Sequence, residues 1–212
     1  MNVSILDYGM CNLLSVVRAF EHCGAKVIVL DRATDIGNID RLVIPGVGAF
    51  PDCLKEMRAC GMDRMITEFA NSGRPLLGIC VGMQALFEES EEFGLSPGLG
   101  LLPGSVVAIQ STAADGSRLR IPHIGWCPLI YPDLRTTWVN SVLEGLPDRP
   151  EMYFVHSYTA VPKVAEHRLA DAKYGGRLIS AAVQADNIVG LQFHPEKSAS
   201  LGLTVISNFL RI

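Results

Sequence analysis

Residues 75–84 read Pro-Leu-Leu-Gly-Ile-Cys-Val-Gly-Met-Gln, which predicts an apolar strand that turns sharply into a helix. The turn places a lone cysteine, Cys80, between Gly78 and Gly82. A side chain at either glycine would crowd such a turn, and the residue at its apex is held ready as a nucleophile. The helix that follows favours the thiolate, the reactive form of cysteine. The N–H of Val81, in its first turn, is then free to stabilise an oxyanion.

The alternative is that Cys80 is a small buried apolar residue, as many cysteines are. That reading does not explain the two glycines, because a glycine near a helix costs about 1 kcal/mol. We therefore predict that Cys80 is a nucleophile.

A second apolar run, Ile188-Val-Gly-Leu-Gln-Phe193, leads into His194, Pro195 and Glu196. The proline biases His194 towards an extended backbone, in which side chains two residues apart point to the same side. We expect Glu196 to accept a hydrogen bond from one ring nitrogen of His194, leaving the other to take the proton of Cys80. Alone, this pair would be an ordinary surface contact; together with the cysteine turn it completes a triad.

A third segment fits the same chemistry. The run Arg41-Leu-Val-Ile44 predicts a short buried strand, followed by Pro45-Gly-Val-Gly-Ala-Phe50. Two glycines so close together allow backbone N–H groups to point into a cavity. A dinucleotide-binding loop is the competing interpretation, but the third glycine of that motif is missing.

Apolar runs and helical stretches alternate through the first half of the chain, which predicts a mainly parallel sheet flanked by helices. After Pro103, short strands with Gly and Pro punctuation predict an antiparallel extension. The expected strands are 2–6, 25–30, 41–44, 75–79, 105–110, 119–127, 152–158, 166–173, 177–184 and 188–193, and the expected helices are 11–23, 52–72, 81–88 and 198–211. Sites in such sheets form at the carboxyl ends of the strands, where residues 45, 80 and 194 should meet.

The composition is that of a water-soluble enzyme, and 212 residues fit a single domain spanning 1–212. A net charge of −4 gives no reason to expect nucleic-acid binding. No apolar stretch reaches the roughly 20 residues of a membrane span. The chain opens directly on a strand-like run, so we expect no signal peptide. The six cysteines lack CxxC spacing, which favours reduced thiols in the cytoplasm over disulfides or zinc.

Taken together, these segments resemble the class I, triad-type glutamine amidotransferases, and among them the glutaminase subunits of imidazole glycerol phosphate synthase. The resemblance runs from about residue 2 to the carboxyl terminus. It rests on the motifs DYGMCN (7–12), PGVGAF (45–50), GICVGMQ (78–84), LFEESEE (86–92), PHIGW (122–126), YFVHSY (153–158) and FHPEKS (193–198). It implies a flavodoxin-like class I glutamine amidotransferase domain.

The resemblance also implies roles for further residues in glutamine hydrolysis. Cys80, His194 and Glu196 would be the catalytic triad, and the backbone at Val47 and Val81 would hold the oxyanion. The remaining residues implied to contact glutamine are Gly48, Gln84, Glu92, Ser157 and Tyr158. For two of these the residues alone allow another interpretation: Gln84 could cap a helix turn, and Glu92 could belong to a solvated acidic face.

The same family passes ammonia to a (β/α)8 cyclase subunit, which makes imidazole glycerol phosphate and an aminoimidazole carboxamide ribotide in histidine biosynthesis. The resemblance therefore implies a heterodimer, with interface candidates Tyr8, Asn12, Trp126, Tyr153 and Lys197. No cofactor is expected, and no metal, because no three ligands have suitable spacing. We expect His22 and His167 to lie on the surface, and His123 and His156 to be structural.

Three alternatives remain at this point. Cys11 and Cys127 stand where the family usually has Gly and Asn, which keeps open a paralogue that supplies ammonia for amidine formation on a surface sugar. A cysteine peptidase of the same general fold is the second alternative. A non-catalytic module that kept the fold is the third, and the intact triad argues against it.

Overall fold

The apolar run before Cys80 forms a central strand of a nine-stranded sheet in the computed structural model, which describes residues 1–212. Five strands at one end of the sheet are mutually parallel, as predicted. In sheet order they are β2 (Lys26–Leu30), β1 (Asn2–Leu6), β3 (Leu42–Ile44), β4 (Leu76–Ile79) and β13 (Ile188–Leu191). The antiparallel extension is also confirmed. It comprises β12 (Arg177–Ala185), β11 (Arg168–Tyr174), β8 (His123–Ile130) and β9 (Glu151–His156).

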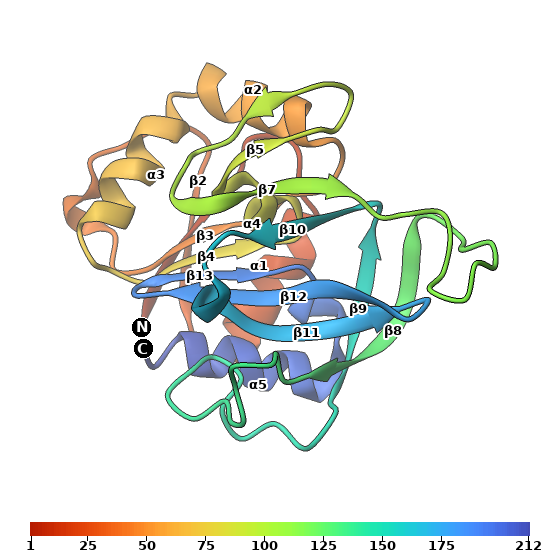
Figure 1. Ribbon diagram of the computed structural model, residues 1–212. Helices are drawn as coiled ribbons and strands as arrows, with labels where there is room; N and C mark the ends of the chain where they lie inside the picture. Colours follow the sequence, from red (N-terminus) through yellow and green to blue (C-terminus); the bar gives the residue numbers. More distant parts are fainter.

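Helices cover both faces of the sheet. Figure 1 shows α2 (Phe50–Ala59) and α3 (Met62–Asn71) above it and α5 (Ala199–Phe209) below it. The helix α1 (Leu13–His22) packs beside α5, where the rings of Phe20 and Phe209 meet edge to face with centroids 6.3 Å apart. No helix is long and apolar enough to cross a bilayer.

Two of the helix predictions were wrong in extent. The expected helix 52–72 is two helices, because Gly61 adopts a left-handed φ of 70° between them. The elbow helix ends early: α4 spans only Val81–Ala85. The carbonyls of Ala85 and Leu86 accept backbone hydrogen bonds from residues 99, 101 and 102, so the chain cannot continue the helical ladder.

A second, four-stranded sheet was not predicted. It contains β10 (Tyr158–Pro162), β7 (Leu102–Ala108), β5 (Phe87–Ser90) and β6 (Ser96–Pro97). The expected strand 105–110 belongs to this sheet rather than to the antiparallel extension. The expected strand 152–158 divides at Ser157 into β9 and β10, which belong to different sheets.

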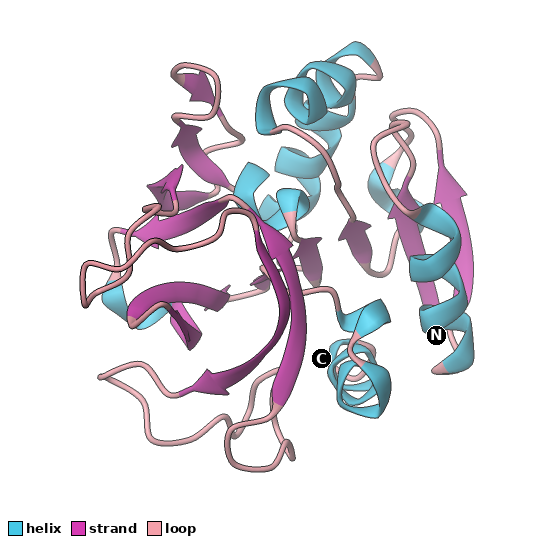
Figure 2. Ribbon diagram, turned by 90° about the vertical axis from the view of Figure 1, so that its right-hand side faces the viewer, coloured by secondary structure: helices cyan, strands magenta, loops and turns pink.

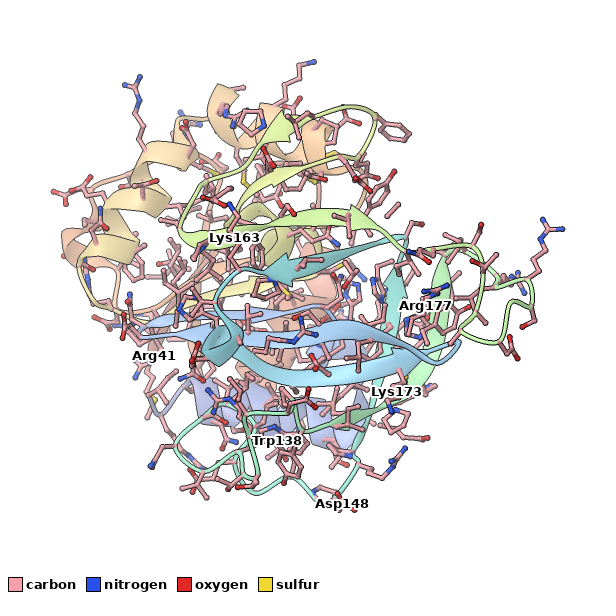
Figure 3. All side chains as sticks on the ribbon, viewed as in Figure 1. Arg41, Trp138, Asp148, Lys163, Lys173 and Arg177 are labelled. Atoms are coloured by element: carbon pink, nitrogen blue, oxygen red, sulfur yellow. The ribbon has the colours of Figure 1, made fainter.

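Side chains fix the connections around these sheets. Lys163, labelled in Figure 3, lies 2.7 Å from Glu88 and joins the end of β10 to β5. Trp138, labelled in the same figure, anchors the long segment between β8 and β9, because its indole N–H donates to the carbonyl of Leu169 at 2.9 Å. Figure 2 shows how strongly the long strands curve beside the helices. Three short 3-10 turns complete the chain: η1 (Ile36–Asn38), η2 (Ala165–His167) and η3 (Pro195–Lys197).

The strand order explains how distant motifs meet. β4 lies between β3 and β13, and all three run in the same direction. Residues 45–48, Cys80 and His194 follow the carboxyl ends of these three strands. The backbone N–H of Cys80 donates to the carbonyl of Leu191 at 2.7 Å, which fixes the nucleophile against the segment that carries His194.

Candidate active site

The turn between β4 and α4 holds Cys80 in a strained backbone conformation. Cys80 has φ of 55° and ψ of −112°, a conformation that residues with a side chain rarely adopt. A Cβ on Gly78 would lie 2.5 Å from the carbonyl oxygen of Gly82, and a Cβ on Gly82 would lie 1.9 Å from that of Ile44. Both glycines are therefore required by close backbone packing. Cys80 is 3 % exposed and precedes Val81, the first residue of α4.

His194 and Glu196 form a buried pair. The Nδ1 of His194 donates to Oε1 of Glu196 at 2.8 Å, and both side chains are almost fully buried. The pairing confirms the expected contact, although it is made by the 3-10 turn η3 rather than by a continuing strand. Burial alone would lower the pKa of His194, but the neighbouring Cys80 and Glu196 outweigh burial and raise it to about 10. The other ring nitrogen, Nε2, is buried without a hydrogen-bond partner.

The cysteine and the histidine open onto one cavity of about 260 Å³. Nine residues singled out from the sequence line it. Its lining consists of Val47, Gly48, Cys80, Val81, Gln84, Glu92, Pro122, Val155, His156, Ser157, Tyr158 and His194. A buried thiol, a basic ring nitrogen and a carboxylate that orients the ring are the parts of a cysteine hydrolase.

Comparison with known proteins assigns this arrangement to a family. The family model for glutamine amidotransferase class-I matches residues 4–212. The chain belongs to the class I glutamine amidotransferases. It is 46 % identical over 211 residues to imidazole glycerol phosphate synthase subunit HisH 1 of Legionella pneumophila, covering 100 % of this chain and 99 % of that protein. It is 45 % identical to the HisH subunit of Aromatoleum aromaticum, covering 99 % and 97 %.

Solved structures agree with the fold. The structure of PurLQS from Thermotoga maritima matches with a TM-score of 0.74 and 18 % identity, covering 99 % of this chain and 97 % of that one. At that identity the likeness concerns the fold alone. The mixed sheet with helices on both faces is thus the class I glutamine amidotransferase fold.

In this amidotransferase, the loop after β3 is held from three sides. The N–H of Val47 donates to the carbonyl of Met10 at 2.8 Å. The hydroxyl of Tyr8 donates to the carbonyl of Pro45, and the thiol of Cys53 donates to the carbonyl of Val47 at 3.5 Å. The N–H of Val47 is therefore already engaged, and in this conformation it does not point to an oxyanion.

The residues expected to contact substrate all line the cavity, but some of their groups are already in use. Gln84 donates both amide protons within the protein, to Tyr158 O at 3.1 Å and to Gln192 Oε1 at 3.0 Å. Its carbonyl oxygen remains as an acceptor. Glu92 is half-buried rather than part of an open acidic face, and it accepts from the N–H of Phe50 at 2.8 Å, at the first turn of α2. Burial raises the pKa of Glu92, and the Phe50 hydrogen bond opposes that shift.

The sequence interpretation missed Gln192, Pro122 and Val155 as parts of the site. Gln192 is fully buried, and its amide nitrogen lies 3.8 Å from Cys80 Sγ. A signal was available: Gln192 is two residues before His194, so an extended backbone would place both side chains on one side. The carbonyl of Val155 lies 3.8 Å from the same sulfur.

His123 and His156 are structural, as expected. His156 donates from Nδ1 to the carbonyl of Tyr158 at 2.8 Å, so its Nε2 accepts from Nδ1 of His123 at 3.0 Å. The ring of His123 stacks on Tyr174 with centroids 4.0 Å apart. Burial lowers the pKa of His123 to about 4 and that of His156 to about 3.

These neutral histidines should make stability fall in acid. In the unfolded chain both histidines bind a proton below their ordinary pKa of 6.5, whereas in the folded protein they stay neutral until the pH reaches about 4 or 3. The free energy of unfolding that they contribute above pH 6.5 is therefore lost as the pH falls. His156→Gln keeps a donor for Tyr158 and an acceptor for His123 without titrating. We expect its urea midpoint to fall less than that of the wild type between pH 7.5 and 5. The exposed His22→Gln variant serves as control, and equal pH slopes in all three proteins would contradict the assignment.

The interface candidates do not share one environment. Trp126 is 50 % exposed and stands opposite Tyr153 in the β8–β9 register, with ring centroids 6.0 Å apart. Lys197 Nζ lies 5.9 Å from the Tyr153 ring, so these three residues form one surface patch. Asn12 is exposed at the start of α1. Tyr8 differs: it is only 4 % exposed, and its hydroxyl holds the loop after β3.

Proposed function

We propose that this protein hydrolyses the side-chain amide of L-glutamine through a thioester on Cys80. The sulfur attacks the amide carbon while His194 takes the thiol proton and passes it to the departing ammonia. His194 then takes a proton from water, whose oxygen attacks the thioester and releases glutamate. Glu196 keeps the histidine ring oriented and stabilises its charged form. The observation that carries the proposal is the strained Cys80 facing the same cavity as the buried His194–Glu196 pair.

The cavity supports glutamine as the substrate. Its volume of about 260 Å³ suits a single amino acid. The carboxylate of Glu92 and the carbonyl oxygen of Gln84 provide acceptors for the α-ammonium group of glutamine. We assign the backbone of Gly48, Ser157 and Tyr158 to the rest of the amino-acid end.

We assign oxyanion stabilisation to two backbone N–H groups. The N–H of Val81 lies in the first turn of α4, without an acceptor in its own helix. The N–H of Val47 would serve after it leaves the carbonyl of Met10 and the loop rotates. Such preorganised donors lower the barrier because the site excludes water.

We further propose that the ammonia passes to a (β/α)8 cyclase subunit in a heterodimer that makes imidazole glycerol phosphate and an aminoimidazole carboxamide ribotide in histidine biosynthesis. The full-length relatives are named as subunits of imidazole glycerol phosphate synthase, which supports this pathway. The exposed patch of Trp126, Tyr153 and Lys197, with Asn12, is the proposed docking surface. It connects to the triad, because His194 N–H donates to the carbonyl of Tyr153 at 2.9 Å.

The test is to incubate the protein with a glutamine analogue that carries a diazoketone, and to map the adduct by mass spectrometry. We expect a single adduct on Cys80 and competition by glutamine. Glutamate release would be measured in parallel, with denatured casein as a peptide substrate. Cleavage of casein without glutamate release would favour a peptidase instead.

Glu196→Gln should reduce glutamine hydrolysis without abolishing it. The amide oxygen can still accept from His194 Nδ1, but the negative charge that stabilises the imidazolium is lost. We expect a smaller loss in kcat than for His194→Asn. The exposed Glu166→Gln variant is the matched control. If Glu196→Gln were as inactive as His194→Asn, Glu196 would do more than orient the ring.

We also propose that the protein works in the cytoplasm. All six cysteines are unpaired, including Cys11, Cys23 and Cys60, which are only partly buried. Free thiols persist in a reducing compartment.

A further inference from the structure

Gln192 lies against the reacting sulfur but has no part in the triad. It follows β13 directly, its side chain is fully buried, and its backbone N–H donates to the carbonyl of Ala181 at 2.9 Å. Its amide nitrogen lies 3.8 Å from Cys80 Sγ. This polar side chain is therefore locked in place beside the nucleophile.

The hydrogen bonds around Gln192 determine which end of its amide faces the sulfur. The backbone carbonyl of Tyr158 can only accept, so the atom of Gln84 that lies 3.1 Å from it must be the amide nitrogen. That nitrogen also lies 3.0 Å from Gln192, which must therefore present its oxygen to Gln84. The remaining atom of Gln192, its nitrogen, points an N–H at Cys80.

We propose that Gln192 is a further catalytic residue, whose amide N–H stabilises negative charge on the sulfur of Cys80. The inference rests on the proposed glutamine hydrolysis. In the free enzyme, the N–H favours the thiolate over the thiol. When the thioester is hydrolysed, water oxygen bonds to the acyl carbon, its proton goes to His194, and the carbon–sulfur bond breaks with its electron pair on sulfur. Gln192 stabilises that departing thiolate and transfers no proton itself.

A buried site makes this contact effective. Hydrogen bonds to a charged partner are stronger than neutral ones, and low local polarity increases the difference. The thiol form has its own acceptor, the carbonyl of Val155, at 3.8 Å. The Val155 carbonyl thus favours the thiol form of Cys80, whereas the Gln192 N–H favours its thiolate form.

Other titratable groups surround the same sulfur and stay unchanged in the test. They are His194 with Glu196, then Glu92 and His156 in the cavity wall, and Tyr8 and Cys53 beneath the loop after β3. A change in the titration of Cys80 in a Gln192 variant is therefore assigned to residue 192.

The experiment measures alkylation of Cys80 by iodoacetamide across pH 5 to 10 in the full-length protein, following the Cys80 peptide by mass spectrometry. Gln192→Glu keeps an oxygen for Gln84 but presents a negative oxygen to the sulfur. We expect the pH of half-maximal rate to rise by about one unit or more, which is about a tenfold slower alkylation at pH values below the midpoint. Gln192→Met removes the donor without adding charge, and we expect a smaller rise. The exposed Gln110→Glu variant is the control.

The readouts separate the possible outcomes. Alkylation does not require glutamine turnover, so it stays informative even if the glutaminase assignment fails. An unchanged pH of half-maximal rate in both folded Gln192 variants, with thermal melts as the check on folding, would overturn the inference while leaving glutamine hydrolysis intact. A purely structural role for Gln192 predicts lower melting temperatures without a shift in this pH. We expect the shift, together with a lower kcat and little change in KM.

Discussion

Replacing Cys80 by alanine is expected to abolish glutamate release from glutamine while leaving synthesis from ammonium salts intact. Only the glutaminase half of the reaction needs the thiol, because external ammonia would reach the proposed cyclase partner directly. His194→Asn should cost about as much as Cys80→Ala, since residues that act as a unit have non-additive effects. The measurement is glutamate release and product formation by the chain together with the proposed cyclase partner, first with glutamine and then with ammonium chloride.

The matched control is Cys60→Ala, which removes a partly buried thiol at the junction of α2 and α3. It should retain both activities. Loss of ammonium-dependent synthesis in Cys80→Ala would mean that the residue serves folding or docking. Full glutamine-dependent activity in His194→Asn would remove the histidine from the mechanism.

The second large effect is expected from the partner. With the N–H of Val47 bonded to Met10, the site has only one of the two oxyanion donors that we propose. The loss of one such donor typically lowers kcat by ~10²–10³. Gly46 and Gly48 flank Val47, and Gly48 already has a φ of 103°, so the loop can adopt a second arrangement. Partner plus acceptor nucleotide should therefore raise glutamate release by about 10²–10³ over the isolated chain.

The same experiment can test the proposed docking surface by mutation. Lys197 stands one residue beyond Glu196 and over the Tyr153 ring, so it can pair with an acidic group of the partner. Lys197→Ala should weaken activation while Cys80 remains reactive to iodoacetamide. Lys26→Ala, at the start of the edge strand β2 and the opposite end of the sheet, is the control. Equal glutamate release by the chain alone, with partner, and with partner and acceptor would refute both the loop mechanism and the obligate subunit.

Much of the fold follows from local patterns in the sequence. The bounds of β1 to β4 were predicted within one residue, because short runs of β-branched and aliphatic residues between polar residues are typical of buried strands. The glycines at 78 and 82 identified Cys80, since they are needed wherever a strand turns directly into a helix with backbone against backbone. The pair of His194 and Glu196 followed from their spacing. These features depend on residues that are close together in the chain.

What the sequence did not reveal depends on partners far apart in the chain. The segment after Ala85 continues a helical pattern, yet β5 forms because it pairs with β7 and because residues 99, 101 and 102 donate to the carbonyls of Ala85 and Leu86. Tyr8, in the motif DYGMCN, was expected at the partner interface, but it is buried and its hydroxyl donates to the carbonyl of Pro45. The orientation of the Gln192 amide depends on Gln84, which is 108 residues away in the chain. Gln84 is in turn oriented by the carbonyl of Tyr158, 74 residues from it. Spacing along the chain thus determined the nucleophile and its base, whereas packing between strands decided the second sheet, the resting position of Val47 and the groups around the sulfur. A hydrogen bond between distant residues leaves no periodic signal in the sequence.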